Sequence, residues 1–437
     1  MTHDLSQVIG VNPGEAIFLP ALQLPVVGNV SNPDARAIFP GSAELNWYDP
    51  LNEHFRYCAG LYSLGQSSLR LDDSQETMVT QRDRERTLLI ADSGGYQLGK
   101  NTFHAIKGEM SIPFLQSARY DEVRRRVLAW MEAYADYGMI IDFPAWAIGT
   151  DGFIFTDIND CLKETKRNME FFRDNLTGLS PLKLLSVIQG RNISEALEWY
   201  ESIKGIQQFP YSGWSFAGPI VWDTTITIRM ILKMLKDGRL NENENWLHML
   251  GRGSANAIFV FNILQQCLDE YIGKGIRISF DVSTPFQEAG RHGKVYTHLQ
   301  ETKNGYTMPF TEYSELDSLV KLVSKFPTSA KWCGPFDEDV VINELEVELS
   351  KQHPNKTDAK TSAYLAHRNL YLYCKALEIV VWNSKSLISP QNRPAYPDIF
   401  RRFRNDVRTI FSKFAKGDIG DDEIEYLDIS REYENLI

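Results

Sequence analysis

Three aspartates in this 437-residue chain come at the ends of short apolar runs. Asp92, Asp142 and Asp281 directly follow residues 87–91, 139–141 and 276–280. A single aspartate in such a place is usually a turn or cap residue. Carboxylates that converge on one site are the common general acids, bases and nucleophiles of enzymes. Whether these three carboxylates lie in one site therefore depends on the fold of the chain.

A repeated pattern of strand, polar or glycine-rich end and helix surrounds the three aspartates. The expected strands end at Asp92, Asp142, Gln189, Gly218, Gly251 and Asp281. The expected helices between them cover 120–137, 157–175, 193–203, 223–236 and 255–271. Alternating strands and helices at this spacing are typical of a parallel sheet.

An α/β fold of the (β/α)8 barrel type, with a mostly helical C-terminal extension, accounts for this pattern. Residues 15–21 supply a further strand, and the eighth comes either from the N-terminal part before residue 86 or from 328–333. In such barrels the active site lies at the C-terminal ends of the strands. Three carboxylates and a glutamine would then face one barrel mouth.

Details of two segments follow from local patterns. In the helix 120–137, Val123, Val127 and Trp130 form an apolar face, Arg124 to Arg126 occupy the other face, and Gly138 ends the helix. Pro285 stops the last strand, and residues 287–294 are expected to form a polar loop that contains glycine.

The C-terminal third breaks the strand–helix pattern. Segments 311–325, 360–380 and 396–416 are expected to be helical, followed by an acidic tail. We therefore divide the chain into a catalytic barrel, residues 1–305, and a region of closing helices and helical extension, residues 306–437.

Composition narrows the class of protein. The net charge of −11 argues against a protein that simply coats nucleic acid. The five cysteines form no CxxC or CxC pair, so neither a disulfide framework nor an evident zinc site follows. With no apolar run long enough for a membrane span and no signal-peptide pattern at the N-terminus, we expect a cytoplasmic protein without a membrane partner.

Five motifs, in order, resemble the signatures of the queuine/guanine tRNA transglycosylases. They are Asp92-Ser-Gly-Gly-Tyr-Gln97, Ser186-Val-Ile-Gln189-Gly190, Ala217-Gly218, Leu250-Gly-Arg-Gly253 and Phe280-Asp281-Val-Ser-Thr-Pro285. The resemblance covers roughly residues 14–300 and rests on these motifs. It implies a (β/α)8 barrel that exchanges a guanine in a polynucleotide for a 7-deazaguanine base.

The resemblance also implies roles for the two catalytic carboxylates. Asp281 would be the nucleophile that traps the anomeric carbon covalently, and Asp92 the general acid and base. Two carboxylates that face a glycosidic bond follow the same logic in retaining glycosidases. This chemistry requires no cofactor.

Further residues would hold the base, by the same resemblance. Asp142 would accept hydrogen bonds from the guanine edge, and Gln189 and the Gly218 N–H would donate to O6. Tyr96 and Leu250 would enclose the ring, which requires the target base to leave its stack. Ser93, in the first motif, is carried over as a substrate-binding residue. Asp223 is either a contact to the 7-substituent or the N-cap of the following helix.

The chain departs from the tRNA enzymes where they carry a CxCxxC…His zinc site. Only Cys333 stands in that region, and His367 resembles the zinc histidine. One cysteine and one histidine are too few for a structural site, so structural zinc is not expected.

The missing zinc motif and the helical extension resemble the branch that acts on DNA, the 7-deazaguanine DNA transglycosylases of phages and bacterial DNA-modification clusters. The expected partners are DNA (alternatively tRNA), a free 7-deazaguanine base such as 7-cyano-7-deazaguanine, and accessory modification proteins. A phage-encoded form would act in the host cytoplasm.

Phosphate contacts are expected from Arg291, His292 and Lys294, and from basic stretches 119–126, 163–167 and 401–408. The alternative for each is an ordinary solvated charged surface. At the level of function, two other classes remain: a non-catalytic partner subunit, and an unrelated barrel glycosidase. The first predicts a lost nucleophile or base, and the second has no need of a guanine-edge reader.

Overall fold

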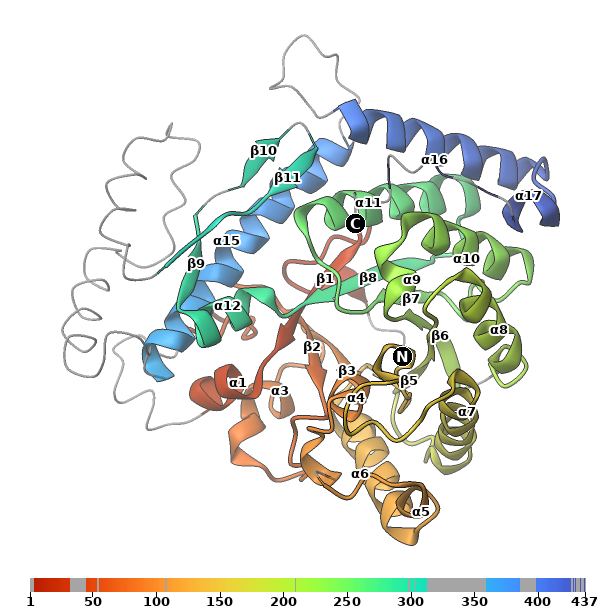
Figure 1. Ribbon diagram of the computed structural model, residues 1–437. Coiled ribbons are helices and arrows are strands. Elements are labelled where there is room, and N and C mark those ends of the chain that lie inside the picture. The colour runs from red at the N-terminus through yellow and green to blue at the C-terminus, as the bar shows by residue number, and fades with distance from the viewer. Residues whose placement is uncertain are drawn as a thin grey trace, which may run out of the picture.

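Eight parallel strands form a closed barrel in the computed structural model (Figure 1). They are β1 (Ile17–Leu22), β2 (Ala59–Ser63), β3 (Leu88–Asp92), β4 (Tyr137–Met139), β5 (Lys183–Ile188), β6 (Tyr211–Phe216), β7 (Trp246–Met249) and β8 (Arg277–Val282). Each strand pairs with the next in sequence, and β1 pairs with β8 to close the barrel. The (β/α)8 barrel predicted from sequence is therefore confirmed.

The structure describes residues 4–312 and 359–425, apart from 32–44, 53–54, 107, 209, 298, 303 and 386–397, together with 427, 429, 433 and 436. The eighth strand is β2, from the N-terminal part of the chain; segment 328–333 lies outside the described residues. Within the described residues, no helix is long and apolar enough to cross a membrane.

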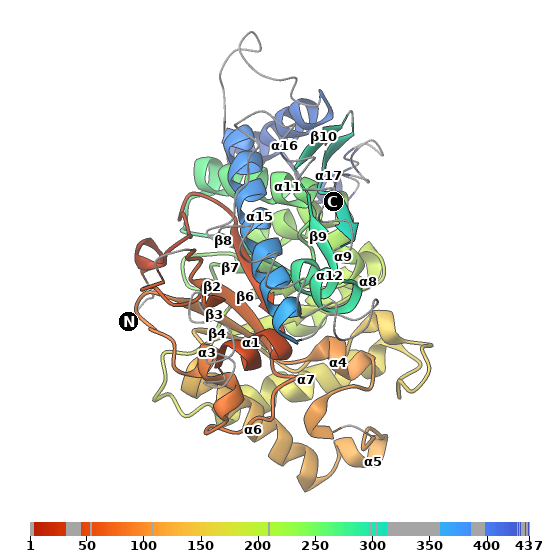
Figure 2. The ribbon, with the colours of Figure 1, turned by 90° about the vertical axis from the view of Figure 1, so that its left-hand side faces the viewer.

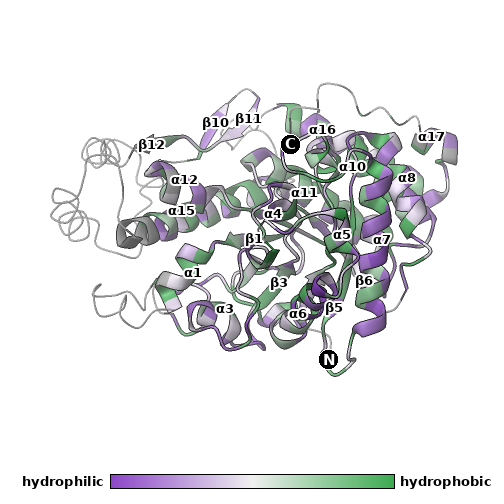
Figure 3. Cartoon of the chain, turned by 60° about the horizontal axis from the view of Figure 1, so that its bottom comes forward, coloured by the Kyte–Doolittle hydropathy of each residue, from purple (hydrophilic) through white to green (hydrophobic). Residues whose placement is uncertain are grey.

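Helices surround the barrel and follow its strands. They are α1 (Leu24–Ser31), α3 (Thr77–Thr80), α4 (Gly95–Gly99), α5 (Ile112–Leu115), α6 (Ala118–Tyr134), α7 (Ile158–Asn175), α8 (Ile193–Ile203), α9 (Pro219–Trp222), α10 (Thr224–Lys236), α11 (Ala255–Cys267) and α12 (Thr284–His292). Figure 3 shows the outer helix α7 with hydrophilic and hydrophobic residues interspersed, as expected where one face packs inward and the other meets water.

Helix α6 differs from its expected form in two respects. It ends at Tyr134, and Gly138 lies inside β4, where a Cβ would come within 2.6 Å of the Met131 sulfur. Arg124, expected on the exposed face, is buried, and its guanidinium lies 3.9 Å from the centre of the Phe171 ring on α7. The aromatic ring and the ion pair with Asp121 make burial of this cation tolerable.

The segment after β8 is helical rather than the polar loop expected for 287–294. Pro285 occupies the first turn of α12, a position where a missing N–H costs nothing. Phe286 and Ala289 of this helix are buried. The local sequence with its glycine looked like a loop, and tertiary packing made it a helix.

The C-terminal region packs on the outside of the barrel. Short strands β9 (Lys294–Tyr296) and β12 (Phe310–Glu312) pair with each other, as do β10 (Gln300–Thr302) and β11 (Gly305–Thr307). The division drawn at residue 305 falls within β11. The long helix α15 (Ala359–Lys385) packs against α11, α12 and α1 (Figures 1 and 2).

Two more helices follow. Helix α16 (Asp398–Lys416) packs on α11 and α17 (Asp421–Glu425) on α10. The expected helices 360–380 and 396–416 are thus present. Of the expected helix 311–325, residues 311 and 312 belong to strand β12, and 313–325 lies outside the described residues.

Candidate active site

Three buried carboxylates gather at the C-terminal end of the barrel. Asp92 ends β3, Asp281 is the fifth residue of β8, and Asp142 lies three residues beyond β4. The charge of Asp281 raises the pKa of Asp92, and the charge of Asp92 raises the pKa of Asp142. Asp92 therefore lies within electrostatic reach of both Asp281 and Asp142, and all three side chains are buried.

Asp281 is held through one oxygen. The Gly251 N–H, just after β7, donates to Oδ1 at 2.6 Å. The His248 Nε2, on β7, lies 3.2 Å from the same oxygen. Asp281 is 6% exposed and His248 is fully buried, so their contact is shielded from water, whereas Gly251 lies at the surface.

The surroundings of Asp92 favour the protonated form of its carboxyl. Burial is the main cause that raises the pKa of its carboxyl above the ordinary value, and the Asp281 charge adds to it. Hydrogen bonds with Ser63 and the Gly94 N–H act in the opposite direction. A raised pKa brings a carboxyl closer to the range in which a general acid works at neutral pH.

Asp142 and Gln189 form a polar pair in the same site. The Gln189 Nε2 donates to Asp142 Oδ2 at 2.6 Å, and burial raises the pKa of Asp142 to about 7. A Cβ on Gly95 would approach Asp142 Oδ1 to 2.6 Å, so only glycine fits there. In the described part of the chain, the buried Gln189 Oε1 has no hydrogen-bond partner.

Gly218 lies next to this pair. Its backbone has φ +64° and ψ −145°, a conformation open essentially to glycine alone, and it begins α9. A Cβ there would lie 3.7 Å from Gln189 Oε1. The structure thus brings Asp142, Gln189 and Gly218 together, as the resemblance implies.

The two residues expected to enclose a base differ in exposure. Tyr96 on α4 is 60% exposed, and its ring centre lies 5.6 Å from that of Trp146 in the turn Ala145–Ala147. The Lys100 Nζ lies 5.2 Å from the centre of the Trp146 ring. Leu250 follows β7 and is partly buried against the core.

Ser93 and Asp223 each make a hydrogen bond to the backbone. The buried Ser93 hydroxyl donates to the Ile140 carbonyl, which ties the end of β3 to the segment after β4. The Asp223 carboxylate accepts from the Ile226 N–H and caps α10, as its alternative reading predicted. Both residues help to shape the site through the backbone.

The expected phosphate-binding residues lie on and after α12. Arg291 and His292 end the helix, His292 is exposed, and Lys294 begins β9 and is half-buried. In the other basic stretches many guanidinium groups are already paired: Arg167 with Glu164, Arg401 with Asp398 and Arg408 with Glu270.

The weak zinc candidates do not form a site within the described residues. His367 is buried on α15 between the rings of Trp47 and Phe55. Cys374, seven residues further along the same helix, is also buried, and burial holds the pKa of its thiol well above the ordinary value. Cys333 lies outside the described residues, where no group of ligands can be assessed; in the described part no cluster of three or more suitable side chains occurs.

Sequence reasoning overlooked His248, Ser279 and Trp146. His248 and Ser279 are polar residues in the middle of β7 and β8, where a barrel interior is normally filled by apolar side chains. That contrast was the available signal. Trp146 gave none, because an aromatic residue after a strand is commonly core.

The fold and this acidic site define a (β/α)8 barrel protein with convergent polar groups at its strand ends. Comparison of the sequence with protein-family models and with curated proteins returned no match.

Proposed function

We propose that this protein is a transglycosylase that exchanges guanine in DNA for a 7-deazaguanine base through a covalent aspartate–sugar intermediate. The observation that carries the proposal is the pairing of an anchored carboxylate, Asp281, with a carboxyl of raised pKa, Asp92, at one barrel mouth. Nucleophile and proton carrier are the two groups that a double displacement at an anomeric carbon needs.

The reaction divides into two balanced halves. Asp281 attacks the anomeric carbon, the bond from that carbon to the guanine nitrogen breaks, and the departing base takes the proton of Asp92. The incoming base then gives its N–H proton to the Asp92 carboxylate, and its nitrogen forms the new bond. Asp281 leaves as a carboxylate, ready for the next cycle.

The neighbouring polar groups suit recognition of a guanine edge. Asp142 offers acceptors, and Gln189 retains one amide hydrogen beyond the one it gives Asp142. Gly218 brings backbone beside them. The exposed Tyr96 ring supplies a flat apolar surface on which a flipped base can stack. DNA is favoured over tRNA because the sequence lacks the CxCxxC motif of the tRNA enzymes.

The test is incorporation of labelled guanine into duplex DNA, single-stranded DNA and unmodified tRNA in parallel. We expect label in DNA and a protein–DNA adduct that survives denaturation. Asp281→Asn should abolish the adduct and lower exchange at least about 1,000-fold. Asp174→Asn, an exposed aspartate paired with Arg173, is the control and should leave both unchanged.

Label in tRNA alone would assign the tRNA reaction instead. An adduct that persists in Asp281→Asn would refute the nucleophile. No label in any nucleic acid, with a cell extract supplied as a source of partner proteins, would favour the partner-subunit alternative.

A further inference from the structure

A chain of polar side chains runs inside the barrel and ends on Asp281. The Trp246 Nε1 and the His248 Nδ1 each lie 2.8 Å from the Ser279 hydroxyl oxygen, and the His248 Nε2 lies 3.2 Å from Asp281 Oδ1. Trp246 and His248 belong to β7, Ser279 and Asp281 to β8, and His248 is the register partner of Ser279. All four side chains are buried.

The two ends of the chain indicate the direction of its hydrogen bonds. An indole N–H can only donate, so the Ser279 oxygen accepts from Trp246. The Ser279 O–H is then free to donate to His248 Nδ1. In a neutral imidazole, a proton on Nε2 can donate to Asp281 Oδ1, whereas the other tautomer would turn a lone pair toward a carboxylate oxygen. The contact with Asp281 therefore favours the Nε2–H tautomer.

Both donors to Asp281 reach the same oxygen. Gly251 N–H and His248 Nε2–H converge on Oδ1, whereas Oδ2 has no hydrogen bond to any described residue. Two donors on one oxygen fix the plane of the carboxylate. The other oxygen keeps its lone pairs available, as a nucleophile requires.

We propose that His248 is a positioning residue that holds Asp281 so that Oδ2 attacks the anomeric carbon. This inference rests on the proposed function. In the covalent intermediate Oδ2 is the ester oxygen and Oδ1 the carbonyl, which still accepts from both donors. When the ester breaks, negative charge returns to the carboxylate, and the same two donors stabilise it as a leaving group.

Kinetics of adduct formation test the role. His248→Phe removes the donor and keeps an aromatic ring, whereas His248→Gln keeps an N–H at a similar reach. With saturating DNA, we expect His248→Phe to slow single-turnover adduct formation about 10- to 100-fold, by analogy with residues that orient the ligands of metal sites. DNA affinity should change less than about threefold, and His248→Gln should recover most of the rate.

Ser215→Ala provides the matched control. Ser215 is the register partner of His248 on β6, it is buried, and its hydroxyl has no partner in the described part of the chain. Its rate should equal that of the wild type, whereas Ser279→Ala should be slowed. Thermal unfolding of each variant shows whether it folds.

A second measurement does not depend on turnover. Nitrogen-15 histidine spectra, with the His248 signal identified by its loss in His248→Gln, should report the Nε2–H tautomer, and Ser279→Ala should shift that signal. An Nδ1–H tautomer would overturn the inference. This measurement determines the direction of the hydrogen bonds in the chain even if His248→Phe does not fold.

The outcomes separate the two claims. If the wild type forms the adduct and His248→Phe forms it at the same rate, only the positioning role of His248 is refuted. The same holds if His248→Phe and His248→Gln slow adduct formation equally. Loss of DNA binding with an unchanged adduct rate would do the same. A wild type that forms no adduct with any nucleic acid sinks the proposed function, and the role of His248 with it.

Discussion

At the scale of single residues, burial disfavours the charged form of Asp142. Desolvation is the main cause that raises the pKa of its carboxyl to about 7, although the Gln189 amide donates to it. An unfolded aspartate has a pKa of about 3.9. Between about pH 4 and pH 7 the folded protein therefore holds more protons than the unfolded chain, and stability falls as pH rises through that window. The proposed base recognition needs this costly charge.

Asp142→Asn should consequently stabilise the protein at high pH. The shift corresponds to about 4 kcal/mol at about 1.4 kcal/mol per pKa unit, so a gain of about 1–4 kcal/mol at pH 8 is expected. The gain should fall to about a third of its pH 8 value at pH 5, where the folded carboxyl is protonated and only the unfolded aspartate is ionised. Urea unfolding of both proteins at the two pH values measures it. An equal difference at pH 5 and pH 8 would contradict the assignment.

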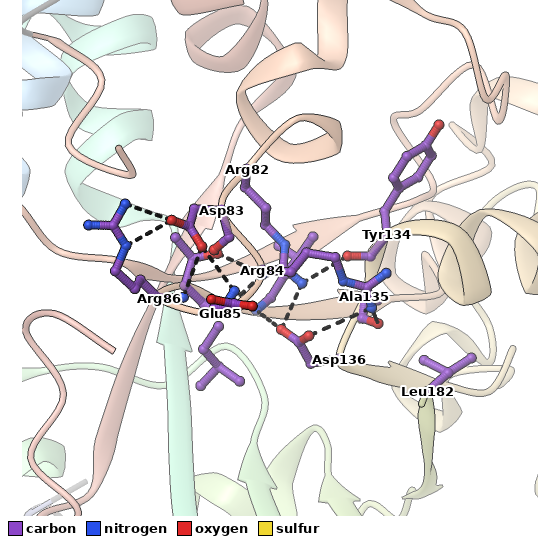
Figure 4. A network of polar contacts seen from close by, with 12 residues as sticks. Arg82, Asp83, Arg84, Glu85, Arg86, Tyr134, Ala135, Asp136 and Leu182 are labelled. Atoms are coloured by element: carbon purple, nitrogen blue, oxygen red, sulfur yellow. Dashed lines mark hydrogen bonds and ion pairs between the residues drawn. The ribbon is translucent and has the colours of Figure 1, made fainter. Parts of the chain in front are cut away.

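At the scale of elements, a buried ion pair joins the N-terminal ends of β3 and β4. Asp136 Oδ2 accepts from the Arg82 Nη2 and from the Leu89 N–H, each at 2.8 Å, and the Arg84 Nη2 lies 3.8 Å from Oδ1 (Figure 4). Arg82 also donates to the Tyr134 carbonyl at the end of α6. This network is at the opposite end of the strands from Asp92, so it supports the barrel without entering the site.

Asp136→Ala should destabilise the barrel strongly. Removing one partner leaves the Arg82 charge and the Leu89 N–H buried without their acceptor, which typically costs about 3–5 kcal/mol. The control is Asp72→Ala, which breaks an exposed pair with Arg70 and should cost less than about 1 kcal/mol. Chemical denaturation reports both values. Similar small losses in the two variants would show that the buried network contributes little.

At the scale of the whole molecule, α15 packs on the outside of the barrel, although it begins more than 70 residues beyond β8. Asn369, fully buried on this helix, donates to the Pro285 and Lys294 carbonyls and accepts from the Tyr296 N–H. Tyr373, one turn further, donates to the Gly253 carbonyl. One helix thus fixes the backbone after β7 and β8, the two strands that supply and hold Asp281.

Asn369→Leu should therefore lower the free energy of unfolding by weakening the packing of α15 against the barrel. It leaves two buried backbone groups and one partly buried group without their side-chain partner. At about 1–3 kcal/mol for each buried group, we expect a loss of about 2–6 kcal/mol. Asn383→Ala, on the same helix, removes one hydrogen bond to the Tyr306 hydroxyl and should cost about 0.5–1.5 kcal/mol. Denaturant titration compares them. If Asn383→Ala costs as much as Asn369→Leu, the packing of α15 does not depend on the Asn369 contacts.

The sequence by itself determined the barrel and the positions of Asp92, Gln189 and Asp281 at or next to the ends of strands; Asp142, expected to end its strand, lies three residues beyond β4. Apolar runs of strand length, glycine-rich ends and amphipathic helices are local signals, and parallel strands must bring their C-terminal ends to one edge. This is why the candidate carboxylates could be chosen without a structure.

Tertiary structure decided what depends on partners distant in sequence. The strand β2 is short and carries glycine, and it is a strand because it pairs with β1 and β3. Helix α12 packs against α15, and Arg124 is buried because α7 offers it an aromatic face. The bond between His248 and Asp281 spans two strands, and no local pattern records which side chains meet across a barrel.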